Sequence, residues 1–448
     1  MVGLAAAVGV QAAAGQAGGD PLGGYIREAL TANATLRQER LGLEARESAV
    51  KEARGLFLPS VTLDTRYSEM QGGLDLGDLV NPAYRALNEL TGTAQFPTDI
   101  DGRFPFAAET RVRLVQPVFH AGIVSNYRVQ SRLKDMAAAG VRAAARQLAA
   151  DVQLAYVDHA CAARVVDVYR AMQTLVNENV RVARRLLENG KVTADAVHRA
   201  EADRLAVEQQ LAEAEQQRDA AAGRFNLLLG RSLDAEIELV PDSVLLAPLE
   251  LTEEEAVASA LRAREELVQV QELVRVAEAR QRAARSSYLP NVSIAIDYGV
   301  QGNRYRFDRD NDFATLSLVA SWNLFNGLQD AARAEQAGID ADRARIQRGD
   351  VERQVELHAR TAYEAVRVGE KAVDAANARA VAARRGYELV ARRYEEGMVS
   401  TLELLDARTA LTNAELNRVL TVHDLFARRV ELERAAALRD MDDFGATR

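Results

Sequence analysis

The chain has 448 residues, of which 27% are charged and only 5% are aromatic, and its formal net charge is −9. This acidic balance excludes the basic surface of a nucleic-acid-binding protein, and the single cysteine, Cys161, excludes a disulfide framework or a cysteine metal cluster within one chain. The excess of Ala, Arg, Glu, Leu and Gln favours long, closely packed helices over a large globular core.

The N-terminal stretch, residues 1–20, reads MVGLAAAVGVQAAAGQAGGD. Its small apolar residues resemble the hydrophobic region and cleavage end of a secretory signal, so we expect a signal-peptide remnant and an exported protein. No later stretch holds 18 or more consecutive apolar residues, and no transmembrane helix is predicted.

The chain repeats itself. The phrase ARGLFLPSV at 53–61 returns as ARSSYLPNV at 284–292, which is 231 residues later. Further along, QPVFHAG at 116–122 returns as WNLFNG at 322–327, only 206 residues later, so the first copy carries 25 extra residues between the two motifs. An internal duplication with one enlarged loop is the simplest explanation.

The duplication predicts two structural repeats, 21–245 and 246–448, each with a helix, two strands joined by a loop, a long helix, a tip turn and a second helix. None of the nine prolines falls between Pro117 and Pro241 or after Pro290, so the long stretches there can be helical. In chain order, the expected helices cover 22–56, 124–188, 194–228, 252–286, 329–395 and 400–437. Ala between the heptad-spaced apolar residues allows close packing on two sides, which favours antiparallel helical hairpins.

Four stretches alternate between apolar and polar side chains. In the third, Val292, Ile294 and Ile296 share one face, and Ser293 and Asp297 lie on the other. The predicted strands lie at about 60–69, 109–119, 291–301 and 313–324. Their length suits a tilted strand that crosses a bilayer. Two of them begin at Leu-Pro pairs, namely Leu58, Pro59, Leu289 and Pro290. A possible short helix, NPAYRALNEL, lies in the loop 69–109.

Two interpretations compete for these strands. In a soluble protein the apolar face would pack on a core, but no spare amphipathic element is present to cover it. In a membrane protein that face meets lipid and the polar face meets water, which explains more of the pattern. Four strands cannot close a barrel, whereas three copies give twelve strands around a watery interior. The expected fold is therefore mainly α with a small β part: long antiparallel helical hairpins form an α-barrel, and four transmembrane strands per protomer contribute to a trimeric 12-stranded β-barrel.

The Leu-Pro strand starts, the QPVF and WNLFNG motifs, and the ENGKVT (188–193) and EEGMVS (395–400) turns resemble those of the TolC-like outer-membrane efflux protein family, the outer membrane factors. The resemblance spans residues 25–439 in the family's two-repeat order. It implies a trimeric duct in the Gram-negative outer membrane, with a helical part extending into the periplasm. The implied partners are other copies of the chain, outer-membrane lipid, a periplasmic adaptor (membrane fusion protein) and an inner-membrane transporter of the RND or ABC type.

By position, the resemblance implies adaptor contacts at the two tip turns. The residues concerned are Gly190, Lys191, Val192, Thr193, Gly397, Met398, Val399, Ser400 and Thr401. Glycine suits a turn that reverses the chain between two helices. Thr193 and Ser400 could equally be ordinary helix N-caps.

Charged residues within a few turns of the tips are candidates for an aperture gate. They are Arg185, Glu188, Asp195, Glu388, Arg392 and Asp406. They could form ion pairs between helices that hold the tip shut, or they could form an ordinary solvated helix face.

Other motifs give weaker evidence of function. Asp308, Asp310 and Asp312 alternate as at the start of a calcium loop, but Phe313 stands where that loop needs glycine, which favours a solvated loop. The five histidines show no pair at i, i+4, and the common nucleotide-binding and hydrolase motifs are absent. We therefore expect no enzyme, no catalytic or metal-binding residue and no cofactor.

The leading hypothesis is the passive exit duct of a tripartite efflux system for small molecules such as drugs or metals. An alternative with the same architecture is the exit duct of a type I protein-secretion system. A more remote one is a soluble periplasmic coiled-coil scaffold.

Overall fold

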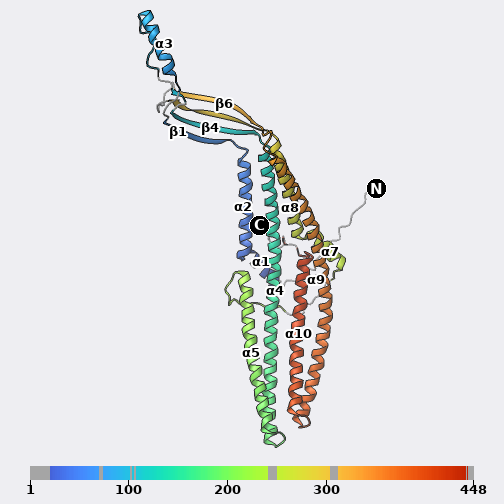
Figure 1. The fold of residues 1–448 in the computed structure, drawn as a ribbon. Helices are drawn as coiled ribbons and strands as arrows, with labels where there is room; N and C mark the ends of the chain where they lie inside the picture. Colours follow the sequence, from blue (N-terminus) through green and yellow to red (C-terminus); the bar gives the residue numbers. More distant parts are fainter. Residues whose placement is uncertain are drawn as a thin grey trace, which may run out of the picture. The chain divides into compact units, whose positions relative to one another are not determined.

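The computed structural model describes residues 21–69, 74–100, 103–104, 107–240, 250–302, 311–439 and 441 (Figure 1). The expected signal-peptide remnant at 1–20 and the loop residues Asp308 and Asp310 lie outside the described residues. The elements of the first half are α1 (Pro21–Ala32), α2 (Ala34–Gly55), β1 (Ser60–Tyr67), β2 (Leu74–Asp75), α3 (Leu76–Thr91), β3 (Arg103–Phe104), β4 (Ala108–Phe119), α4 (Ala121–Glu188) and α5 (Ala194–Leu229). Those of the second half are α7 (Glu253–Ala263), α8 (Glu265–Arg285), the 3₁₀ turn η1 (Ser286–Tyr288), β5 (Asn291–Gly302), β6 (Asp312–Ser321), α9 (Gln329–Glu395) and α10 (Thr401–Ala435).

The two halves follow the same order of elements. The first residues of α2 and α8 are 231 positions apart, and so are those of β1 and β5. The first residues of α4 and α9 are only 208 positions apart, because the first half carries α3 with its flanking strands β2 and β3 between β1 and β4. The enlarged loop therefore accounts for the change in spacing.

The first helix of each half is broken, although the sequence predicts a continuous helix over 22–56 and 252–286. The breaks fall at Asn33 and Arg264. The Asn33 side chain accepts a hydrogen bond from the backbone N–H of Thr35 at 2.9 Å and so caps α2. The Arg264 guanidinium donates to the Ala435 carbonyl oxygen at 3.1 Å. Side-chain bonds to backbone groups outweigh helix continuation here, and hydrophobic periodicity does not reveal them.

The chain forms two compact units, and each draws on both halves. The helical unit comprises the described residues of 1–43, 137–269 and 348–448. The sheet unit comprises those of 44–136 and 270–347.

The sheet unit contains a four-stranded antiparallel sheet in the order β1-β4-β5-β6. The central pair, β4 and β5, joins the two halves of the chain, and β1 and β6 form the edges. Gly299 of β5 is required by this pairing, because a Cβ there would lie 2.1 Å from the Thr110 carbonyl oxygen and 2.6 Å from the Cα of Arg111. The strands are close enough at this point that only glycine fits.

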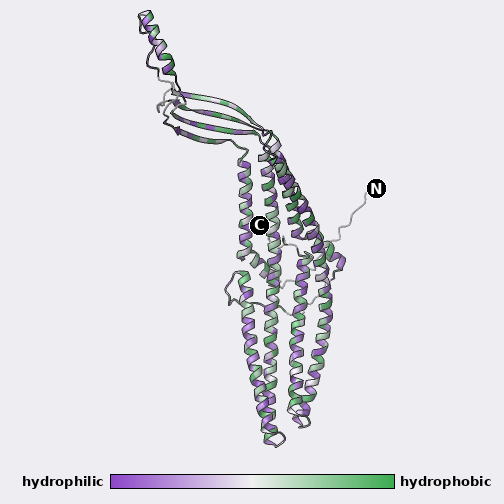
Figure 2. Cartoon of the chain, viewed as in Figure 1, coloured by the Kyte–Doolittle hydropathy of each residue, from purple (hydrophilic) through white to green (hydrophobic). Residues whose placement is uncertain are grey.

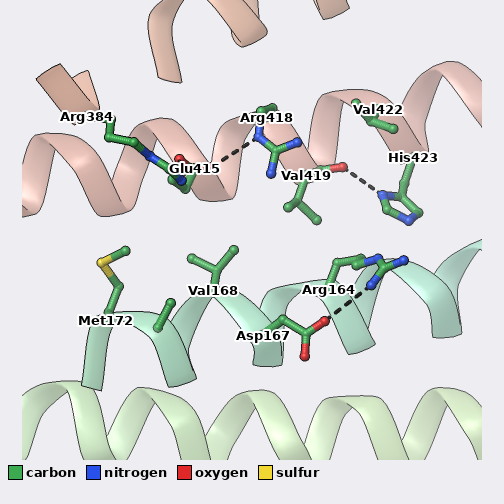
Figure 3. Close-up of a pocket in the computed structure, with 11 residues that line it drawn as sticks. Arg164, Asp167, Val168, Met172, Arg384, Glu415, Arg418, Val419, Val422 and His423 are labelled. Atoms are coloured by element: carbon green, nitrogen blue, oxygen red, sulfur yellow. Dashed lines mark hydrogen bonds and ion pairs between the residues drawn. The ribbon is translucent and has the colours of Figure 1, made fainter. Parts of the chain in front are cut away.

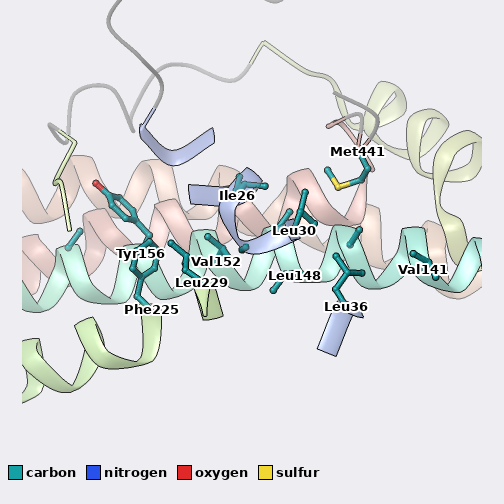
Figure 4. Packing of buried hydrophobic residues seen from close by; sticks show 14 residues of the cluster. Ile26, Leu30, Leu36, Val141, Leu148, Val152, Tyr156, Phe225, Leu229 and Met441 are labelled. Atoms are coloured by element: carbon teal, nitrogen blue, oxygen red, sulfur yellow. The ribbon is translucent and has the colours of Figure 1, made fainter. Parts of the chain in front are cut away.

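The helical unit has its largest core where α1, α4 and α5 meet (Figure 4). Ile26, Tyr156 and Phe225 are completely buried there. The Tyr156 hydroxyl accepts a hydrogen bond from the Val240 backbone N–H at 2.6 Å, so the buried oxygen is satisfied. This core ties the segment after α5 to the long helix.

Two antiparallel hairpins, α4–α5 and α9–α10, make up most of the rest of the helical unit, which also includes α7. Ion pairs Arg170–Glu215 (2.8 Å) and Arg184–Glu201 (2.7 Å) connect α4 with α5. One hydrophobic cluster joins the two hairpins and contains Met172, Val176, Val182, Leu186, Val207, Tyr387, Tyr394, Leu404 and Leu411. Each hairpin therefore packs on the other as well as on itself.

Candidate functional site: the sheet faces and the helix tips

One face of the four-stranded sheet is apolar and uncovered. Val61, Leu114, Ile296 and Leu316 lie side by side in one row across the four strands. Val61 is 63% exposed and Leu316 is 74% exposed, so no other described residues cover them. Figure 2 shows the alternation of hydrophobic and hydrophilic residues along the strands. An apolar surface of this extent is stable against lipid rather than water.

The opposite face is polar and carries all but one of the acidic and basic side chains of the four strands. We call these residues the charge ladder: Asp64, Arg66, Glu109, Arg111, Arg113 and Asp297. The exception, Asp312, is the first residue of β6 and lies opposite Val300 on the apolar side. The sheet thus separates a lipid-compatible face from a water-compatible one.

The two Leu-Pro pairs stand where helix gives way to strand. The Leu58 backbone N–H donates to the Gly55 carbonyl oxygen at 3.0 Å, and the Leu289 N–H donates to that of Ser286 at 3.1 Å. Pro59 and Pro290 follow, directly before β1 and β5. Proline lacks the N–H that a helix needs and forces the preceding residue toward extended backbone, which ends each helix at this point.

The same contact closes both of these junctions. The Gln116 side chain donates from Nε2 to the Phe57 carbonyl oxygen at 2.9 Å, and the Trp322 indole donates to the Tyr288 carbonyl oxygen at 3.0 Å. Phe57 and Tyr288 are equivalent in the duplication, and so are Gln116 and Trp322. Sequence reasoning missed this contact, although the equivalent positions could have revealed it.

The last strand is shorter than the sequence predicts. β6 ends at Ser321, so Trp322, Asn323 and Leu324 lie beyond it. The Trp322 indole donates to the Tyr288 carbonyl oxygen in η1, just before β5. The Asn323 side chain donates to Asp330 Oδ2 at 3.0 Å, in the first turn of α9. These side-chain bonds end the pairing of β6 with β5 before the alternation of apolar and polar residues ends.

Each tip turn is built on one glycine in the left-handed conformation, with φ of +67° at Gly190 and +77° at Gly397. At the first tip, the Gly190 N–H bonds to the Leu187 carbonyl oxygen and the Lys191 N–H to that of Leu186, both at 2.9 Å. At the second, the Gly397 and Met398 N–H groups bond in the same pattern, at 2.9 and 2.8 Å. Both turns are Schellman motifs, which close the helix end and reverse the chain.

The helices that follow the turns begin differently. Ser400 caps α10 in a capping box with Glu403, so its hydroxyl has a structural role. Thr193 occupies the equivalent position before α5 but makes no side-chain bond to the backbone, and its hydroxyl contacts Asp195 instead. That hydrogen bond, together with the Arg199 charge, holds the pKa of Asp195 below its ordinary value.

The two tips touch each other and present an exposed surface. The Lys191 side chain packs over Gly397: a Cβ atom added to that glycine would lie 3.5 Å from Lys191 Cδ. Val192, Val399 and Thr401 are half-buried, whereas Lys191, Thr193 and Ser400 are exposed. Met398 is 65% exposed. The nine predicted tip residues therefore form one continuous end of the helical unit.

The six predicted gate residues are all exposed and do not pair with one another in this protomer. Arg185 lies 3.8 Å from Glu178, and Asp195 lies 3.5 Å from Arg199, each within its own helix. In the part of the chain that the structure describes, no ion pair involves the remaining four, which are Glu188, Glu388, Arg392 and Asp406. Their charges remain available to another copy or to solvent.

A buried polar junction between the hairpins was not predicted from the sequence. Arg408 of α10 forms an ion pair with Asp203 of α5, and the side chains are only 10% and 13% exposed. The Tyr387 hydroxyl donates to Asn179 Oδ1 at 3.3 Å in the same region. Burial raises the pKa of Asp203, and the Arg408 charge offsets this only in part. No spacing rule links residues of two hairpins, so the sequence carries no direct signal for this pair.

A cavity of about 340 Å³ lies between α4 and the α9–α10 hairpin (Figure 3). On one wall, Glu415 accepts from Arg384 at 2.6 Å and from Arg418 at 3.1 Å. Burial raises the pKa of Glu415, but these two guanidinium groups outweigh it and lower the pKa. His423 Nδ1 lies 2.8 Å from the Val419 carbonyl oxygen. Glu415 and His423 Nδ1 therefore have partners within the chain, whereas His423 Nε2 is buried without one among the described residues. Because the lining residues come from α4, α9 and α10, we regard the cavity as a seam between the hairpins.

The described residues include no group of three or more His, Cys, Asp or Glu side chains that could hold a metal ion. Within the same residues, no helix combines the length and the apolar character needed to cross a membrane.

Comparison with known proteins places these features in a family. The family profile described as "Outer membrane efflux protein" matches residues 25–231 and 256–437. A comparison with curated protein sequences found no match.

Several solved structures share the fold. The outer membrane protein VceC from Vibrio cholerae is 18% identical, with a TM-score of 0.75 over 93% of this chain and 95% of that one. The CmeC outer membrane channel of Campylobacter jejuni is 14% identical, with a TM-score of 0.77 over 95% and 88%. The open-state MtrE outer membrane channel of Neisseria gonorrhoeae is 18% identical, with a TM-score of 0.74 over 93% and 88%. The expected mainly α fold with a small β part is thereby confirmed, as is its likeness to TolC-like channels. The chain belongs to the outer membrane efflux protein family, a family of Gram-negative outer-membrane channels rather than enzymes.

Proposed function

We propose that three copies of this chain form a duct through the outer membrane, which serves as the exit of a tripartite efflux system for small molecules. The observation that carries this proposal is the uncovered apolar face of a four-stranded sheet. Lipid is the natural solvent for that face, and water for the charge ladder behind it.

The open edges of the sheet support a trimer. Among the strands that the structure describes, β1 and β6 each have a neighbour on one side only. An unpaired strand edge in lipid leaves N–H and C=O groups without partners, so β6 of one copy must pair with β1 of the next until the ring closes. Two copies would give eight strands, whose interior side chains must fill. Small residues such as Ser293, Ala295 and Gly299 on the polar face favour a wider, water-filled ring of twelve.

Mass and conductance test the duct. The protein extracted from the outer membrane in detergent should have the mass of a trimer, and after insertion into planar bilayers it should conduct ions. A monomeric or dimeric protein in the soluble periplasmic fraction would instead support the scaffold interpretation.

The helix tips are the proposed docking surface for a periplasmic adaptor, which links the duct to an energy-consuming transporter of the inner membrane. The support is their exposure and their position at the chain reversals. A photo-crosslinking amino acid at Met398 should capture the adaptor in intact cells, whereas one at Leu420, which is 54% exposed on α10, should not. Equal capture at both positions would place the adaptor along the hairpin rather than at its tip.

The proposed gate uses two charges, Glu388 and Arg392, that form no ion pair with the other residues described by the structure. Glu388 and Arg392 lie one turn apart near the end of α9 and are both exposed. If they pair with another copy to narrow the aperture, Glu388→Ala combined with Arg392→Ala should raise the single-channel conductance. An unchanged conductance would remove both residues from the gate and leave them as a solvated helix face.

A further inference from the structure

The charge ladder on the polar face of the sheet is balanced residue by residue. Three guanidinium groups and three carboxylates occupy adjacent positions on β1, β4 and β5. On β6, the polar face is formed by Phe313, Thr315, Ser317, Val319 and Ser321, which carry no charge. The polar face of the described strands therefore has no net charge.

Each member of the ladder contacts a member of opposite sign. Glu109 lies 3.0 Å from Arg66 and 3.0 Å from Arg111. Arg111 also reaches Asp64 at 3.6 Å on the neighbouring strand. The pairs hold the long side chains across the strands and against the sheet.

The strongest contact is between Arg113 and Asp297. Arg113 donates from Nε to Oδ1 at 2.6 Å and from Nη2 to Oδ2 at 3.2 Å, which is the two-pronged geometry preferred by guanidinium and carboxylate. The Asp297 side chain is only 11% exposed, so it is among the best-shielded charges of this face. Asp297 also lies 3.9 Å from Arg111 Nε. If Arg113 or Asp297 lost its charge, the polar face would carry one unbalanced charge per chain.

We propose that this ladder makes the strand-lined section of the duct indifferent to the sign of a solute's charge, with Arg113 and Asp297 as the pair that sets the balance. The inference rests on the proposed trimeric duct. Rings of unpaired charge select ions in many pores, and pairing each charge with its opposite cancels that field. Both anionic and cationic solutes then pass this section, and discrimination by charge must arise elsewhere along the route.

A thiol reporter tests the proposal directly. Thr315 lies opposite Asp297 on β6 and is exposed on the same face, so Thr315→Cys places a thiol beside the pair. The background is Cys161→Ala, although burial already raises the pKa of the Cys161 thiol to about 11 and leaves it unreactive at neutral pH. The probes are a sulfonate and a trimethylammonium methanethiosulfonate, and the measured quantity is the ratio of their reaction rates with the purified trimer.

With the intact ladder, this ratio should be within about twofold of that at a control thiol, Ser321→Cys, several residues further along the same face and beyond the screening length. Asp297→Asn should raise the sulfonate-to-ammonium ratio at Thr315→Cys by about fivefold, and Arg113→Gln should lower it by about the same factor. The double variant should return to the starting ratio, and Arg113→Lys, which keeps the charge, should not change it.

The outcomes separate this inference from the proposed function. If neither reagent reacts with Thr315→Cys, the polar face does not line water, and the duct itself is refuted. If both react but the ratio stays constant in Asp297→Asn and Arg113→Gln, the duct stands and the ladder does not set its charge preference. Retention of the trimer mass in each variant excludes misfolding as the cause.

Discussion

At the scale of single residues, the most consequential feature is the ion pair between Asp203 and Arg408. It joins two hairpins through side chains that are almost wholly buried. A buried pair contributes little net stability compared with apolar residues of the same shape, but removing one partner leaves an uncompensated charge. The pair therefore matters for stability mainly because the loss of one partner would be strongly destabilising.

Arg408→Ala should destabilise the helical unit by about 3–5 kcal/mol, because Asp203 is then buried without its counter-charge. Thermal unfolding followed by circular dichroism at 222 nm measures the loss. The matched control is Arg379→Ala, which removes an exposed arginine of α9 and should lower stability by less than about 0.5 kcal/mol. Equal midpoints for the two variants would mean that Arg408 is not buried in the assembled protein.

The pH dependence of Asp203 provides a second prediction. Because its pKa is raised in the folded protein, the folded state binds a proton more readily than the unfolded state does. Protonation at this site therefore favours folding, and its contribution to stability grows as the pH falls through the raised pKa. Asp203→Asn lacks this contribution, so wild type should gain thermal stability relative to the variant between neutral and acidic pH. A stability difference that is independent of pH would contradict the raised pKa.

At the scale of elements, the tip turns show how much a local motif can specify. Two short sequences, ENGKVT and EEGMVS, end helices of 68 and 67 residues with the same set of backbone hydrogen bonds. Both depend on a glycine whose φ is strongly positive. A side chain at that position would strain the turn whatever space surrounds it.

Gly190→Ala and Gly397→Ala should therefore each lower the free energy of unfolding by about 1 kcal/mol and weaken adaptor capture at the tip. Gly386→Ala is a suitable control, since that glycine lies inside α9 with open space around it. There alanine should be neutral or stabilise the helix by up to about 1 kcal/mol. Opposite signs in the thermal midpoints of tip and control variants would support the left-handed conformation, and equal signs would contradict it.

Much of the architecture can be predicted from the sequence because the same motifs occur in both structural repeats. The two Leu-Pro phrases and two glycine turns mark equivalent helix and strand ends, and alternation in the strands distinguishes the apolar face from the polar one. The breaks at Asn33 and Arg264 depend instead on side-chain bonds to distant backbone groups. The Asp203–Arg408 pair joins residues 205 positions apart, and a single sequence contains no periodic signal for such a contact.

At the scale of the whole molecule, the two faces of the sheet should respond differently to the same substitution. Leu316→Arg places a charge on the apolar face, where it should cost about 2–4 kcal/mol if the position lies near the bilayer midplane. Ser317→Arg places the same side chain on the polar face and should be tolerated. The measured quantity is the yield of heat-resistant trimer in the outer-membrane fraction. Equal yields would show that the apolar face does not meet lipid.

The tight tip turns also bear on the order of assembly. Each hairpin is closed by contacts between residues near one another in the chain, and contacts of low sequence separation form fast. The sheet, by contrast, pairs β4 with β5 across the two halves of the chain. In the proposed duct, its edges pair with further copies. A newly exported chain can therefore reach the membrane with its hairpins already formed, and the slow, concentration-dependent step is left to the strands.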